Sequence, residues 1–110
     1  MTKDDFIAYR GPSDLHDGTV LSVARMGDAT SVVVGLSEGG VAEFDFSDTE
    51  QIVAREPEGM VLYALAELRV DGASRRFSFV NWEDSSSRIL EVRARGGRWR
   101  IRQSGTWRDL

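Results

Sequence analysis

The sequence predicts an all-β fold, with six or seven antiparallel strands in meander order that form a small barrel or a two-layer sandwich. Three observations favour this class. Several segments alternate apolar and polar residues with a period of two, as the two faces of a strand require. Turn sequences such as Gly27-Asp28, Asp71-Gly72 and Gly96-Gly97 separate these segments. The segments are also rich in β-branched and aromatic residues, so only one or two short helical segments are expected.

The length of 110 residues predicts a single domain over residues 1–110, with a core of about residues 15–103 and a tail at 104–110. Hydrophobic residues make up 41% and charged residues 29%, which is typical of a globular chain. Residues 2–10 could form a short helix with Thr2 as N-cap, and Gly11-Pro12 would end it.

The first hairpin is expected to join strands at residues 18–26 and 29–36 through Gly27-Asp28. A two-residue turn sets the register of this hairpin and places apolar residues on one face. The predicted facing pairs are Val23 and Val32, Leu21 and Val34, and Thr19 and Leu36.

Residues 41–46 alternate clearly and should add a third strand, with a three-residue loop at 38–40, or an equivalent longer loop, that pairs position 34 with position 44. Phe44 and Phe46 then join the core face, and Glu43 and Asp45 lie on the opposite face. The sequence Ser47-Asp48-Thr49-Glu50 has the form of a capping box, which predicts one or two helical turns at residues 48–54.

Residues 60–70 carry an apolar face with a period of two, which favours a long strand, although the composition also suits a helix that begins after Pro57. Residues 76–82 are strongly β by composition. Phe77 and Phe79 lie on one face of this strand, and Val80 and Trp82 on the other. Such a strand is either central in the sheet or borders another subunit.

The last third of the chain predicts a second hairpin over residues 88–103, with Gly96-Gly97 as its turn. Trp99 and Ile101 would face the core. Five arginines would share the other face: Arg93, Arg95, Arg98, Arg100 and Arg102. The full predicted core comprises Leu21, Val23, Val32, Val34, Phe44, Phe46, Leu62, Leu68, Phe77, Phe79, Leu90, Val92, Trp99 and Ile101.

This arginine ladder is a candidate contact for an anion or a protein partner, because guanidinium groups bind phosphates and carboxylates in bidentate fashion. Internal neutralisation is the favoured alternative. Residues 1–55 carry ten acidic and four basic side chains, so Glu43 and Asp45 could face the arginines. Nucleic acid is the least favoured partner, because Trp99 points away from the ladder and the whole chain has a net charge of −4.

The single histidine, His16, precedes Asp17 and forms a second candidate polar site. The pair could belong to a metal site or to a His–Asp base, or it could be a turn before the first strand. No second catalytic group can be placed beside His16. The chain has no cysteine, which excludes thiolate chemistry and disulfides, and its glycine-rich segments lack the lysine of a phosphate loop. We therefore expect no catalytic residue, metal or cofactor.

No apolar run approaches the length of a membrane helix, and the acidic N-terminus lacks the apolar core of a signal peptide. These features predict a cytoplasmic protein that does not bind membranes. Abundant Arg, Gly, Ala and Val beside a single Lys suits a GC-rich bacterial genome.

From Leu15-His16-Asp17-Gly18-Thr19-Val20 onward, the chain resembles small uncharacterised bacterial domains that begin with a hydrophobic-His-Asp-x-x-hydrophobic pattern. In those domains an alternating hairpin, a phenylalanine-containing strand, a central β pair and an acidic-hydrophobic alternation follow. The corresponding segments here are residues 21–36, 41–46, 60–82 and 89–101. The resemblance implies an all-β domain of unassigned function and carries no catalytic residue, and the arginine-rich ending departs from its pattern.

Taken together, these features predict a non-enzymatic protein-interaction module that binds another protein or a second copy of itself. The two-sided apolar strand at 76–82 and the three tryptophans motivate this expectation. The alternative is anion or nucleic-acid binding through residues 88–103.

Overall fold

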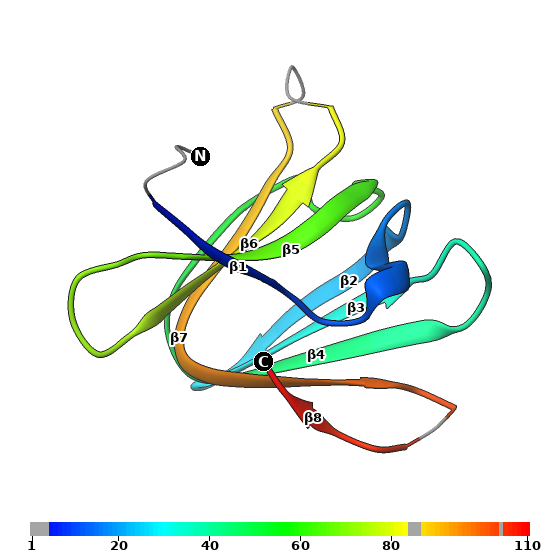
Figure 1. The fold of residues 1–110 in the computed structure, drawn as a ribbon. Coiled ribbons are helices and arrows are strands. Elements are labelled where there is room, and N and C mark those ends of the chain that lie inside the picture. Colours follow the sequence, from blue (N-terminus) through cyan, green and yellow to red (C-terminus); the bar gives the residue numbers. More distant parts are fainter. Residues whose placement is uncertain (1–4, 84–86, 104) are drawn as a thin grey trace.

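A computed structural model describes residues 5–83, 87–103 and 105–110 and confirms the all-β fold (Figure 1). All the strands of the described chain belong to one antiparallel sheet with the order β1-β5-β6-β7-β4-β3-β2, and β8 pairs with β7. A short 3-10 helix, η2 (Ser13–Leu15), precedes β2. The strands are β1 (Phe6–Arg10), β2 (Thr19–Met26), β3 (Ala29–Gly35), β4 (Val41–Arg55), β5 (Leu62–Leu68), β6 (Arg75–Asn81), β7 (Ile89–Ile101) and β8 (Arg108–Asp109).

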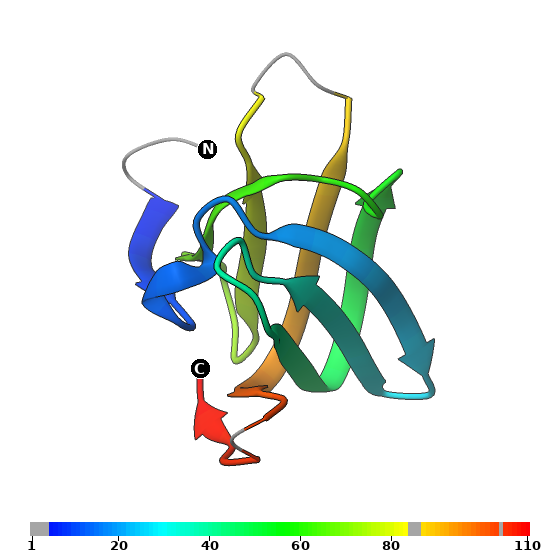
Figure 2. The ribbon, with the colours of Figure 1, turned by 90° about the vertical axis from the view of Figure 1, so that its right-hand side faces the viewer.

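The sheet consists of two meanders, β2-β3-β4 and β5-β6-β7, which meet where β4 pairs with β7. Meander order therefore holds within each group, but the consecutive strands β4 and β5 are not neighbours. The long strand β7 bends sharply, and β2, β3 and β4 come to lie across from β5 and β6 (Figures 1 and 2). The sheet stays open rather than closing into a barrel, although the Val20 amide donates to the Met60 carbonyl at 2.9 Å.

The predicted hairpin at residues 88–103 is wrong, because β7 continues through Gly96-Gly97 as one strand without a turn. Gly96 pairs with Ser47 and Gly97 with Phe46 of the neighbouring strand β4. A Cβ at Gly97 would lie 2.8 Å from Leu110 Cδ1 and 2.9 Å from Phe46 Cδ1. Glycine at this position serves close packing inside a strand, not a turn.

The two predicted helices are also wrong. Residues 48–54 form the second half of β4, which continues through an irregularity between Thr49 and Gln51 and pairs with β7. Cross-strand pairing over this length overrides the local capping signal. Residues 6–10 form β1 and pair with β5; the expected N-cap, Thr2, lies outside the described residues. The preference for a strand at 60–70 is confirmed by β5.

The first hairpin is confirmed, with its turn at Gly27-Asp28 and with Val23 opposite Val32. A register shift between Val20 and Ser22 then places Val20 opposite Val34. Leu21 is consequently 51% exposed and is not part of the core, while Val20 is buried. The turn between β3 and β4 is centred on Glu38, one residue earlier than predicted, so Phe44 pairs with Val32 instead of Val34.

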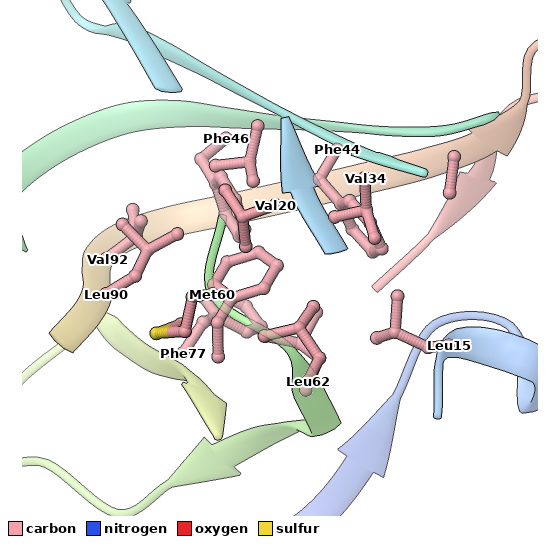
Figure 3. Close-up of a cluster of buried hydrophobic side chains, with 14 of the residues drawn as sticks. Leu15, Val20, Val34, Phe44, Phe46, Met60, Leu62, Phe77, Leu90 and Val92 are labelled. Carbon is pink, nitrogen blue, oxygen red and sulfur yellow. The ribbon is translucent and has the colours of Figure 1, made fainter. Parts of the chain in front are cut away.

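The core lies between the two halves of the folded sheet, where Phe44, Phe46, Phe77 and Met60 point toward one another (Figure 3). Most of the predicted core is confirmed as buried, whereas Val23, Trp99 and Ile101 are only partly buried against it. The sequence reasoning missed several buried residues: Leu15, Val20, Leu36, Ala42, Met60, Leu65 and Ala94.

Candidate functional site

Three of the five predicted arginines have carboxylate neighbours on β4. Arg100 Nε and Arg102 Nε donate to Glu43 Oε1 at 3.2 and 3.1 Å. Arg98 lies 3.6 Å from Asp45. The predicted match between the arginine ladder and the acidic face of residues 41–46 is confirmed at these three positions. It arises because β4 and β7 are direct neighbours in the sheet.

The local environment of Glu43 stabilises its charged form. Desolvation alone would raise the pKa of this carboxyl, but hydrogen bonds and charge attraction from Arg102 and Arg100 lower it below its usual value. The tail covers the same arginines: the Arg98 and Arg100 guanidiniums lie 4.2 and 4.4 Å from the Trp107 ring centroid. These contacts give each of the three guanidiniums a partner, while the Arg98 and Arg102 side chains stay 52% and 53% exposed.

The other two ladder residues lie elsewhere. Arg93 stands opposite Gln51 and Arg76, and its buried Nε has no hydrogen-bond partner among the described residues. Arg95 is exposed and borders a pocket of about 330 Å³ whose other charged residues, Asp28, Asp48 and Glu50, are acidic. Glu91, on the same strand, pairs with Arg76 of β6. The five arginines therefore do not form one continuous basic surface.

A buried ion-pair cluster that the sequence did not reveal is centred on Glu67. Arg75 binds this carboxylate in bidentate fashion at 2.8 and 3.0 Å, and Arg10 donates to it at 2.9 Å. Hydrogen bonds from Arg75 and then Arg10 lower the pKa of Glu67 despite its desolvation. The cluster ties together β1, β5 and β6 and is fully occupied by its own partners.

His16 and Asp17 form the second predicted site, and the structure brings Trp82 to them. Trp82 Nε1 donates to Asp17 Oδ1 at 2.7 Å, and His16 Nδ1 lies 3.4 Å from Asp17 Oδ2. The Asp17 amide donates to the Leu62 carbonyl at 2.8 Å, and its φ of 67° is in the left-handed region. Asp17 therefore holds both rings from a fixed backbone position.

Four aromatic side chains gather around Asp17 on the surface; we call Tyr9, His16, Tyr63 and Trp82 the aromatic patch. The ring centroids of His16 and Trp82 lie 4.9 Å apart, those of Tyr63 and Trp82 5.4 Å, and those of His16 and Tyr63 5.5 Å. Tyr9 packs 6.1 Å from Tyr63. Each contact is edge to face, a preferred geometry for aromatic pairs.

The aromatic patch remains open to solvent. Tyr9 is 53% exposed, Trp82 46% and Tyr63 41%. Desolvation, together with the neighbouring Tyr63, raises the pKa of the Tyr9 hydroxyl. Beside the patch, a pocket of about 260 Å³ is lined by Tyr9, His16, Tyr63 and Arg10 among others. Sequence reasoning identified His16 and Asp17 but missed Tyr63, which reaches them because the start of β5 lies beside the start of β2, and Tyr9, which the pairing of β1 with β5 brings to Tyr63.

A larger cavity of about 770 Å³ lies near the β2–β3 turn and is lined by Met26, Phe46, Gly97, Arg98 and Leu110 among others. Two of its charged side chains already have partners, because Arg75 binds Glu67 and Arg98 lies beside Asp45.

Within the described part of the chain, no three His, Asp or Glu side chains are grouped so that they could hold a metal ion. None of the described helices is long and apolar enough to cross a membrane. Comparison with protein-family models, with curated proteins and with solved structures finds no match to this chain. The candidate site therefore rests on the geometry of the aromatic patch.

Proposed function

We propose that this protein is a non-enzymatic protein-interaction module that binds its partner through the aromatic patch. The observation that carries the proposal is the exposure of four aromatic rings in mutual contact, two of which, His16 and Trp82, lie beside the Asp17 carboxylate. Tyr and Trp dominate binding hot spots, because they bury a large area while losing little conformational freedom. A group of exposed aromatic residues is a common mark of a binding surface.

The rigidity of the aromatic patch supports this role. Trp82 is held by its hydrogen bond to Asp17, and its ring packs against both His16 and Tyr63. Side chains that are already ordered lose less entropy when a partner binds, so more of the contact energy appears as affinity.

Anion or nucleic-acid binding through residues 88–103 has weaker support. Arg98, Arg100 and Arg102 already have carboxylate neighbours, and Trp107 covers two of them. An added polyanion would have to compete with these internal contacts.

The proposal is tested by selecting peptides from a random phage-displayed library on the folded protein. Selected peptides should lose at least tenfold in affinity when Trp82→Ala or Tyr63→Ala removes an aromatic anchor. Met26→Ala is the matched control, because Met26 is 81% exposed at the β2–β3 turn, away from the patch. Equal affinity for all three variants would contradict the proposal.

Self-association is a separate version of the same function. If the partner is a second copy, sedimentation should show a dimer that Trp82→Ala weakens and Met26→Ala does not. A monomer over a wide concentration range would restrict the proposal to a different protein partner.

A further inference from the structure

We propose that the aromatic patch recognises a cationic side chain, arginine or lysine, on its protein partner. This inference rests on the proposed function and adds the chemistry of the partner.

The charged surroundings of the patch are acidic. Asp17 lies at its centre with a side chain that is 56% exposed. Asp14 and Glu83 are exposed neighbours in the chain, and neither forms an ion pair within the described residues. Arg10, the basic residue beside the adjoining pocket, is ion-paired with Glu67, a carboxylate that it shares with Arg75. A partner that places a positive charge here gains attraction, whereas an anion meets repulsion.

The hydrogen bond from Trp82 to Asp17 strengthens the attraction of the indole ring for a cation. A cation is attracted to the negative face of an aromatic ring, and indole is the best ring for this contact. A carboxylate that accepts the indole N–H pushes electron density into the ring, since hydrogen-bonded groups polarise one another. Asp17 therefore strengthens the site both through its own charge and through the ring that it orients.

The other two tryptophans of the chain already have guanidinium partners. Arg98 and Arg100 lie over Trp107, and Arg108 lies 5.8 Å from the Trp99 centroid. Among the described arginines, none lies over Trp82, although its ring is exposed and hydrogen-bonded to the Asp17 carboxylate. Trp82 thus offers to a partner the type of contact that the chain makes internally at Trp99 and Trp107.

The test titrates 15N-labelled protein with N-acetyl-arginine amide and follows the indole N–H signal of Trp82, assigned by its loss in Trp82→Phe. The matched neutral probe is N-acetyl-citrulline amide, which has nearly the same shape. We expect a saturable shift with the arginine probe and binding about two- to fivefold weaker with citrulline. Equal shifts with both probes, or no shift with either, would overturn the inference.

Two variants separate charge from shape. Asp17→Asn retains an oxygen that can accept the Trp82 hydrogen bond, and asparagine tolerates the left-handed backbone, but the negative charge is lost. The preference of the Asp17→Asn variant for the arginine probe over the citrulline probe should fall. The preference of the Glu83→Gln variant should fall as well. Asp28→Asn removes an equal charge at the β2–β3 turn and should leave the preference unchanged. A preference that survives both patch variants would contradict the inference.

The library selection distinguishes the two proposals. Selected peptides rich in arginine or lysine that require Trp82 support both of them. Peptides that require Trp82 but are neutral or apolar would sustain the proposed function and refute the cationic partner. Peptides that do not require Trp82 would refute the proposed function.

Discussion

At the residue scale, the space around Gly96 and Gly97 determines how closely β4 and β7 pack. Gly97 lies where Phe46 and Leu110 both contact the strand, and a side chain there would overlap both. Its neighbour Gly96 has more room, because an added Cβ would lie 3.3 Å from the flexible Ser47 hydroxyl. The two adjacent glycines therefore have different roles.

Gly97→Ala is expected to destabilise the protein by about 1–3 kcal/mol, because overpacking forces Phe46 or Leu110 from its position. Gly96→Ala is the matched control and should change stability much less, since alanine also reduces the freedom of the unfolded chain. Urea unfolding of both variants checks this prediction. Equal losses of stability in Gly97→Ala and Gly96→Ala would contradict the close-packing role of Gly97.

Glu67 has a predictable pH dependence. Its folded-state pKa lies below the ordinary value of 4.5, so its contribution to stability is present above that value. The contribution is lost as the pH falls through the folded-state pKa. Glu67→Gln should cost about 3–5 kcal/mol at pH 7, because Arg75 and Arg10 lose their buried partner.

The stability difference between the parent protein and Glu67→Gln should shrink as the pH falls below 4.5. Urea unfolding from pH 7 to pH 2.5 measures it, with Glu58→Gln at an exposed loop as the control. A difference that is constant over this range would mean that Glu67 is not charged in the folded protein.

At the scale of elements, local signals predicted local structure and failed where a distant strand decided the outcome. The Gly27-Asp28 hairpin follows from its own sequence, so it was predicted well. The Gly96-Gly97 pair is equally compatible with a turn, and only the pairing of β7 with β4 makes it a strand. The capping box at residues 47–50 was overridden by the same pairing.

The candidate site also contains residues that the sequence identifies and residues that only the fold brings together. His16 and Asp17 are adjacent in the sequence and could be identified from it. Trp82 and Tyr63 reach them because β5 and β6 pair and end beside the start of β2, which no local pattern reveals. The match between Glu43 and the arginines was predictable because alternation fixes the face of each strand and the charges of the two halves differ in sign.

At the scale of the whole molecule, the acidic first half and the basic second half neutralise each other across β4 and β7. We expect the folded protein to bind heparin weakly even at low salt. The double variant Glu43→Gln, Asp45→Asn frees Arg98, Arg100 and Arg102, so it should be eluted from heparin at higher salt. Asp14→Asn, Asp28→Asn changes the net charge equally and is the control. Equal shifts would mean that net charge alone governs retention.

The aromatic patch is the proposed binding site for a partner, whereas the arginine-rich strand β7 pairs with β4 through its ion pairs. The most direct test maps the binding of a selected peptide onto the 15N-labelled protein. The account predicts that the largest chemical-shift changes fall at Tyr9, His16, Tyr63 and Trp82. Changes centred instead on β7 and β8, around Arg98 and Trp107, would contradict it.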